Sequence, residues 1–113
     1  MYDLRQIIKG LSMFVDNDIL PKVSGWQKWV IGAGMGVALD KSVNIFEELK
    51  NNEMVKMLGI IDRNDNVDVD TLYKEIKKQA QKSSVTFNIP MLGILTLNDK
   101  DVDKIYEYIK MEN

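Results

Sequence analysis

The chain contains no cysteine and no histidine among its 113 residues. The absence of cysteine excludes a disulfide framework, a thiol nucleophile and a thiolate metal site. The absence of histidine excludes Ser-His-Asp triads, Cys-His pairs and ordinary zinc sites. Acid–base chemistry would have to come from carboxylates, lysines or tyrosines. We therefore expect a protein that is not an enzyme and that carries no metal ion and no cofactor.

The chain also lacks a large net charge and a long hydrophobic run. The formal net charge is −2 and the pI is near 5.1, whereas a general nucleic-acid binder needs a basic surface. The most apolar window, Trp29–Leu39, is well short of the ~20 residues that span a bilayer. The first residues lack the pattern of a signal peptide. The sequence therefore predicts a soluble, cytoplasmic protein with no nucleic-acid partner and no membrane partner.

The composition is that of a folded globular chain, with 45% hydrophobic and 28% charged residues. A chain of this length is expected to form a single domain over residues 1–113. Apolar residues at helical spacing predict five helices, over residues 3–15, 24–50, 53–61, 71–82 and 99–110. A break within 24–50 and a short strand at 53–61 are alternatives. Asp70 and Asn98 are the expected N-caps of the last two helices.

A hairpin is predicted before the last helix. Residues 85–89 alternate strictly, and residues 94–97 return after a turn expected at Pro90–Gly93. Residues 67–69 are a further candidate strand. The predicted class is α+β and mostly helical: four or five helices with one C-terminal antiparallel β-hairpin. The hairpin should pack on the helices, pair with 67–69 or pair with another subunit. An exposed edge after Leu97 would favour self-association.

One segment of the chain is repeated. DVDTLYKEIK at residues 68–77 resembles DVDKIYEYIK at residues 101–110, with six of ten positions identical and one more conservative. Convergence on an ordinary amphipathic helix with an acidic start explains much of this likeness. A duplicated supersecondary unit is the alternative.

The segment Val30–Gly36 holds three glycines and is similar to the phosphate-binding loop of dinucleotide-binding folds. That pattern needs a further glycine where this chain has Val37, and it needs alternating strands and helices. A helix that carries Gly32 and Gly36 on one face explains the same glycines as a close-packing surface. Small-ligand binding at Gly32–Gly36 stays open as an alternative.

The loop Asp62–Asp70 resembles an EF-hand calcium loop in its oxygen-bearing residues. However, Val67 stands where the motif needs glycine, and Tyr73 stands where it needs a bidentate glutamate. A polar turn with an Asx motif, which leads into a capped helix, is the simpler interpretation. Ion binding at this loop is the alternative.

Two tryptophans, Trp26 and Trp29, are three residues apart and would share a helix face. Such a pair is typical of a core, and it also suits a partner-binding patch. The candidate interaction or close-packing surface of the chain is therefore made of four residues: Trp26, Trp29, Gly32 and Gly36.

The C-terminal half, from VDVDTLYKEIKK through VTFNIPMLGILTLNDKDVDKIYEYI, resembles small uncharacterised proteins of phages and prophages of Gram-positive bacteria. The resemblance implies no known chemistry, and it favours a role in assembly, packaging or host takeover. We expect a non-enzymatic protein-interaction or assembly module that binds a protein partner or itself, as a homo-oligomer. The alternatives are a small-ligand or ion-binding domain, using Gly32–Gly36 or Asp62–Asp70, and a membrane-associated phage protein with Trp26–Leu39 at the interface.

Overall fold

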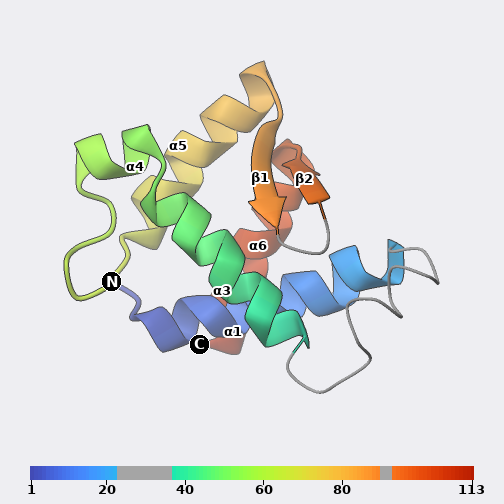
Figure 1. Cartoon of the computed structure of the whole chain (residues 1–113). Coiled ribbons are helices and arrows are strands. Elements are labelled where there is room, and N and C mark those ends of the chain that lie inside the picture. Colours follow the sequence, from blue (N-terminus) through green and yellow to red (C-terminus); the bar gives the residue numbers. More distant parts are fainter. Residues whose placement is uncertain (23–36, 90–92) are drawn as a thin grey trace.

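The computed structural model of the chain describes residues 1–22, 37–89 and 93–113 (Figure 1). The helical elements of these ranges are α1 (Leu4–Phe14), the π-helical turn η1 (Val15–Ile19), the 3-10 turn η2 (Leu20–Lys22), α3 (Val37–Lys50), α4 (Glu53–Leu58), α5 (Val69–Lys82) and α6 (Asp99–Glu112). The strands β1 (Val85–Ile89) and β2 (Gly93–Leu97) lie between α5 and α6 in the sequence. The predicted class is confirmed: the chain is a mostly helical α+β protein with one antiparallel hairpin before its last helix.

Helix α1 begins with a capping box. The Asp3 carboxylate accepts a hydrogen bond from the Gln6 backbone N–H at 2.9 Å, and the Gln6 side chain accepts one from the Asp3 N–H at 2.9 Å. These bonds satisfy N–H groups that a helix start leaves without partners. One face of the helix is buried, with Ile7, Leu11 and Phe14 each 1% exposed. Helical geometry then continues through η1 and η2.

The segment that was ambiguous between helix and strand, 53–61, forms the short helix α4. Its start is fixed by Asn52, whose side-chain oxygen accepts hydrogen bonds from the N–H groups of Met54 and Val55. Its end is fixed by Gly59, which adopts the left-handed conformation with φ of 65°. A side chain at this position would be strained, so glycine is the natural terminator.

Two local predictions around α5 were wrong. Residues 67–69 form no strand: Val67 makes isolated bridges to Tyr2 and Ile61, and Val69 already belongs to α5. The N-cap of α5 is Asp68 and not Asp70. The Asp68 carboxylate accepts hydrogen bonds from the Thr71 N–H at 3.3 Å and the Thr71 hydroxyl at 2.7 Å. This additional hydroxyl contact favours the earlier start.

The hairpin pairs Val85 with Leu97 and Phe87 with Leu95. The side chains of one face point into the core and are buried: Val85, Phe87 and Leu97. Those of the other face are exposed: Thr86, Asn88, Ile94 and Thr96. β1 contacts α3, which confirms that the hairpin packs on the helices (Figure 1). The predicted turn at Pro90–Gly93 lies largely outside the described residues.

Helix α6 lies between α1 and α5 and contacts both (Figure 1). The ends of the chain meet, because the Asn113 side chain donates a hydrogen bond to the Gln6 carbonyl at 3.1 Å. The radius of gyration is 13.6 Å, close to that of a compact chain of this length. Among the helices of the described ranges, none is both long enough and apolar enough to cross a membrane.

The contact between α1 and α6 depends on Gly10. A Cβ atom at this position would lie 2.7 Å from the Ile109 Cα and 2.8 Å from its backbone nitrogen. Both atoms belong to the α6 backbone and cannot rotate away. Glycine therefore lets the two helix backbones approach closely, which offsets the roughly 1 kcal/mol that glycine costs inside a helix.

We predict that Gly10→Ala destabilises the fold by about 1–3 kcal/mol, because overpacking against backbone outweighs the gain in helix propensity. Urea unfolding measures the change in the free energy of unfolding. Lys9→Ala, at the exposed neighbouring position, is the matched control and should change stability little. A Gly10→Ala variant as stable as the parent would contradict the close approach.

Candidate functional site at the seam of α5 and α6

The repeated segments of the sequence face each other in the structure. The copy at 68–77 starts α5, and the copy at 101–110 lies within α6. The beginning of each helix contacts the second half of the other, since Asp70 bonds to Tyr106 and Asp103 bonds to Lys77. The two copies are therefore related by an approximate two-fold axis, and we call their contact the seam.

The tyrosines and aspartates of the seam bond reciprocally. The Tyr73 hydroxyl donates to Asp103 Oδ1 at 2.6 Å, and the Tyr106 hydroxyl donates to Asp70 Oδ1 at 2.6 Å. Asp70 and Tyr73 occupy the same places in the first copy as Asp103 and Tyr106 in the second. The two rings stack on each other with their centroids 4.2 Å apart and an interplanar angle of 25°. Each copy thus uses the same residues to hold the other.

The lysines of the repeat complete the same pattern. Lys77 Nζ lies 2.9 Å from Asp103 Oδ1, and Lys110 Nζ lies 3.4 Å from Asp70 Oδ1. Each ammonium group also lies 5.3 Å from the ring centroid of the tyrosine on its own helix, Tyr73 or Tyr106. Two carboxylates and two ammonium groups leave the seam without net charge at neutral pH.

Contacts within the seam shift the pKa values of its aspartates and of Lys77. The hydrogen bond from Tyr73, followed by that from Lys77, lowers the pKa of Asp103 below 3.8. The hydrogen bond from Tyr106 lowers the pKa of Asp70 in the same way, with help from the charge of Lys110. Hydrogen bonds to Tyr73 and Asp103 raise the pKa of Lys77. All these shifts favour the charged pairs that the geometry shows.

A third anchor joins α6 to η1. Asp18 accepts hydrogen bonds from Lys104 Nζ at 2.8 Å and from the Tyr108 hydroxyl at 2.9 Å. Its side chain is 12% exposed. Burial alone would raise the pKa of Asp18, but the bonds from Lys104 and Tyr108 outweigh it and the pKa is lowered. Asp18 therefore holds η1 to α6 through two residues of that helix, Lys104 and Tyr108.

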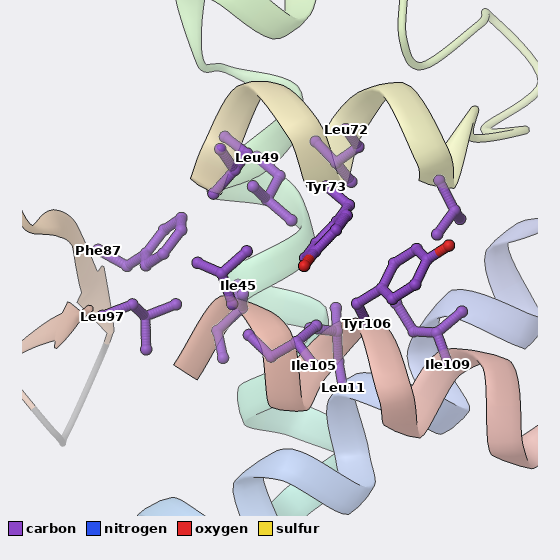
Figure 2. A pocket seen from close by; sticks show the side chains of 13 residues that line it. Leu11, Ile45, Leu49, Leu72, Tyr73, Phe87, Leu97, Ile105, Tyr106 and Ile109 are labelled. Atoms are coloured by element: carbon purple, nitrogen blue, oxygen red, sulfur yellow. The ribbon is translucent and has the colours of Figure 1, made fainter. Parts of the chain in front are cut away.

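An apolar cavity of about 50 Å³ lies beneath the tyrosines (Figure 2). Its walls come from α1, α3, α5, α6 and the hairpin. Figure 2 shows Phe87 and Leu97 entering from the hairpin at one end and Tyr106 at the other. Most of the lining residues are buried; the partly exposed ones are Tyr73, Ile105 and Tyr106. These three mark the place where the cavity reaches the surface.

The hairpin forms a second notable surface. No charged residue occurs between Lys82 and Asp99, although 28% of the whole chain is charged. Ile94 on β2 is 75% exposed. Within residues 1–22, 37–89 and 93–113, the sheet has two strands, so no described strand lies beside the outer edge of β2. The edge of β2 is therefore uncharged and without a neighbouring strand in the described part of the chain.

The four residues of the predicted interaction surface lie outside the described residues: Trp26, Trp29, Gly32 and Gly36. The interfacial segment Trp26–Leu39 lies outside them except for its last residues. The interaction surface and the interfacial segment therefore stay predictions.

The Asp62–Asp70 loop is described, and its carboxylates have partners within the protein. Asp62 accepts hydrogen bonds from the N–H groups of Asn64 and Asn66 at 2.8 and 2.9 Å, which is the expected Asx motif. Asp65 pairs with Lys50 at 2.9 Å, and Asp68 caps α5. In the described ranges, no three residues of metal-binding type converge on one point. The loop thus resembles a capped turn more than a cation site.

The seam was not predicted from the sequence, although the sequence contains its signal. Asp70, Tyr73 and Lys77 share one helix face, because they are spaced by three and four residues. The second copy repeats the same residues at the same spacing. Comparison with protein-family models, curated proteins and solved structures found no match, so no relative assigns a role to these residues.

We predict that the double variant Asp70→Asn, Asp103→Asn loses an acid-sensitive part of its stability. Because both folded pKa values lie below 3.8, the charged pairs stabilise the fold above about pH 4 and lose this effect as pH falls through the folded pKa. Urea unfolding between about pH 7 and pH 2 should show parent and variant converging at low pH. The effect is modest, since both carboxylates are well exposed.

The double variant Asp16→Asn, Glu48→Gln, at two exposed carboxylates away from the seam, is the matched control for the change in net charge. It should leave the pH dependence of stability close to that of the parent. If the Asp70→Asn, Asp103→Asn variant and the parent differ by the same amount at every pH, the ionised pairs of the seam contribute nothing.

Proposed function

We propose that this chain is a non-enzymatic assembly module of phage-related origin that acts in the cytoplasm and binds a second copy of itself. The contact surface in this proposal is the outer edge of β2. The observation that carries it is the hairpin without charge, whose β2 edge has no neighbouring strand among the described residues. The phage-related origin rests on the resemblance of the C-terminal half.

The backbone of β2 supports pairing with another strand. An edge strand presents N–H and C=O groups that only another strand satisfies in a regular way. Antiparallel pairing of two β2 strands, centred on Leu95, would place Ile94 beside Thr96 of the second copy. Such a pairing would cover Ile94, which is 75% exposed in the single chain. It would also turn the two-stranded hairpin, which is marginal alone, into a four-stranded sheet.

The lack of charge favours a second copy as the partner. In a two-fold contact the same patch lies on both sides, so any charge on the edge would face a like charge. Proteins commonly block open edges with lysine or other charged residues. This hairpin carries none between Lys82 and Asp99, so nothing in its side chains opposes self-pairing.

We predict that the chain forms dimers and that Thr96→Lys on β2 abolishes them. Sedimentation velocity over roughly 1 µM to 1 mM detects contacts worth about 4–8 kcal/mol. The matched control is Thr86→Lys, which adds the same charge to the same exposed face but on β1, directly opposite Thr96. In dilute solution, where the chains are monomeric, both variants should melt at the same temperature, and at higher concentration the control should still dimerise.

A parent chain that stays monomeric over this whole range would contradict the proposal. Equal loss of dimers in Thr86→Lys and Thr96→Lys would also count against it, because net charge and not the β2 edge would then control association. If the chain does not self-associate and a strand of another protein binds to β2, that protein replaces the second copy as the partner.

A further inference from the structure

The apolar cavity under the seam has no free polar group on its walls. Its thirteen lining residues are aliphatic or aromatic, and their only side-chain polar atoms are the hydroxyls of Tyr73 and Tyr106. Both hydroxyls already donate to carboxylates at 2.6 Å. Water needs two to four polar partners to occupy a buried site. The interior therefore suits an apolar occupant better than water.

The opening of the cavity is formed by side chains that are partly exposed. Tyr73, Ile105 and Tyr106 are the partly exposed members of the lining. The two stacked rings lie at the rim and are held there by Asp103 and Asp70, which are on the surface. Rotation of the Tyr106 ring would break its hydrogen bond to the exposed Asp70 carboxylate, whereas rotation of the Tyr73 ring would break its bonds to both Asp103 and Lys77. The tyrosine pair thus has the arrangement of a gate.

We propose that this cavity binds an uncharged molecule with an aliphatic chain, which enters between Tyr73 and Tyr106. A dry apolar cavity of about 150 Å³ binds benzene or xenon, and the present cavity of about 50 Å³ fits a slimmer group such as the end of a linear chain. The site needs no second copy of the chain, because a monomer already contains every residue that lines it.

The rim selects against charged ligands. Lys77 and Lys110 are paired with Asp103 and Asp70 at 2.9 and 3.4 Å, so the rim offers no net charge to a carboxylate or an ammonium group. A charged head group would have to compete with these pairs. We therefore assign the site to neutral ligands and expect their affinity to come from buried carbon.

A series of linear alcohols, from ethanol to hexanol, tests the site. Affinity is followed through the NMR shifts of the lining methyl groups of Leu72, Val102 and Ile105. Each added methylene should raise the affinity about fourfold while space remains, and the gain should stop when the cavity is full. The methyl groups of Ile60, which is buried but does not line the cavity, should not respond.

Two variants locate the binding. Ile105→Phe fills the opening with a larger side chain at a partly exposed position, and it should weaken hexanol binding by at least about tenfold, the loss of roughly two buried methylenes. Ile94→Phe makes the same change on the exposed face of β2 and should leave hexanol binding unchanged. The titration of the parent chain decides the question by itself if Ile105→Phe does not fold.

Saturable shifts confined to the lining, with affinity rising along the series, would support the proposal. Shifts that do not saturate, or that spread equally to Ile60, would overturn it. Tighter binding of hexanoate than of hexanol would overturn the assignment to neutral ligands. Failure of the alcohol series would leave dimerisation through β2 untouched, and a monomeric chain that binds hexanol would refute only the dimer.

Discussion

The close approach of α1 and α6 at Gly10 is the constraint on which the rest of the structure depends. With no side chain at this position, the α6 backbone at Ile109 lies directly against α1. This contact fixes how α6 is rotated about its own axis. Val102 and Ile109 then face the core, and Tyr106, three residues before Ile109, faces α5. The seam can form only because α6 is held in this rotation.

The seam itself joins α5 and α6 through polar bonds at the surface and leaves space below them. Each tyrosine hydroxyl is held at the rim by a carboxylate of the other helix. The rings therefore stack on each other and do not fill the volume beneath. A cavity of about 50 Å³ remains, at a cost of roughly 1 kcal/mol from its volume alone. A bound aliphatic chain would recover that cost, which connects the polar gate to the apolar site.

Much of the fold could be predicted from periodicity. Apolar spacing located α1, α5, α6 and the described part of the helix predicted over 24–50, strict alternation located β1, and Asn98 was correctly assigned as the cap of α6. Predictions from local sequence patterns were wrong where two local structures fitted the sequence equally well. Asp68 and Asp70 are both suitable caps, and the choice was decided by the Thr71 hydroxyl. Residues 67–69 look like a strand, but in the described part of the chain no neighbouring strand extends the bridges of Val67.

The candidate site was less predictable because it depends on tertiary contacts. The sequence repeat places Asp, Tyr and Lys on one face of each helix, but it does not say that the two faces meet. Likewise, the sequence alone indicates that Gly10 lowers the helix propensity of its segment. The reason for a glycine there is the position of the Ile109 backbone, which is a tertiary contact. The uncharged hairpin is visible in the sequence, whereas the edge of β2 requires the strand order.

The proposed functions use two different features of the chain: the β2 edge for assembly and the apolar cavity for a neutral aliphatic ligand. The measurement that tests the central claim most directly is hydrogen exchange of the β2 backbone amides as a function of protein concentration. The account predicts that the outward N–H groups of Gly93–Leu97 exchange rapidly in dilute solution and slowly in concentrated solution, while α5 amides are unaffected. Exchange at β2 that is the same at every concentration would contradict assembly through this edge.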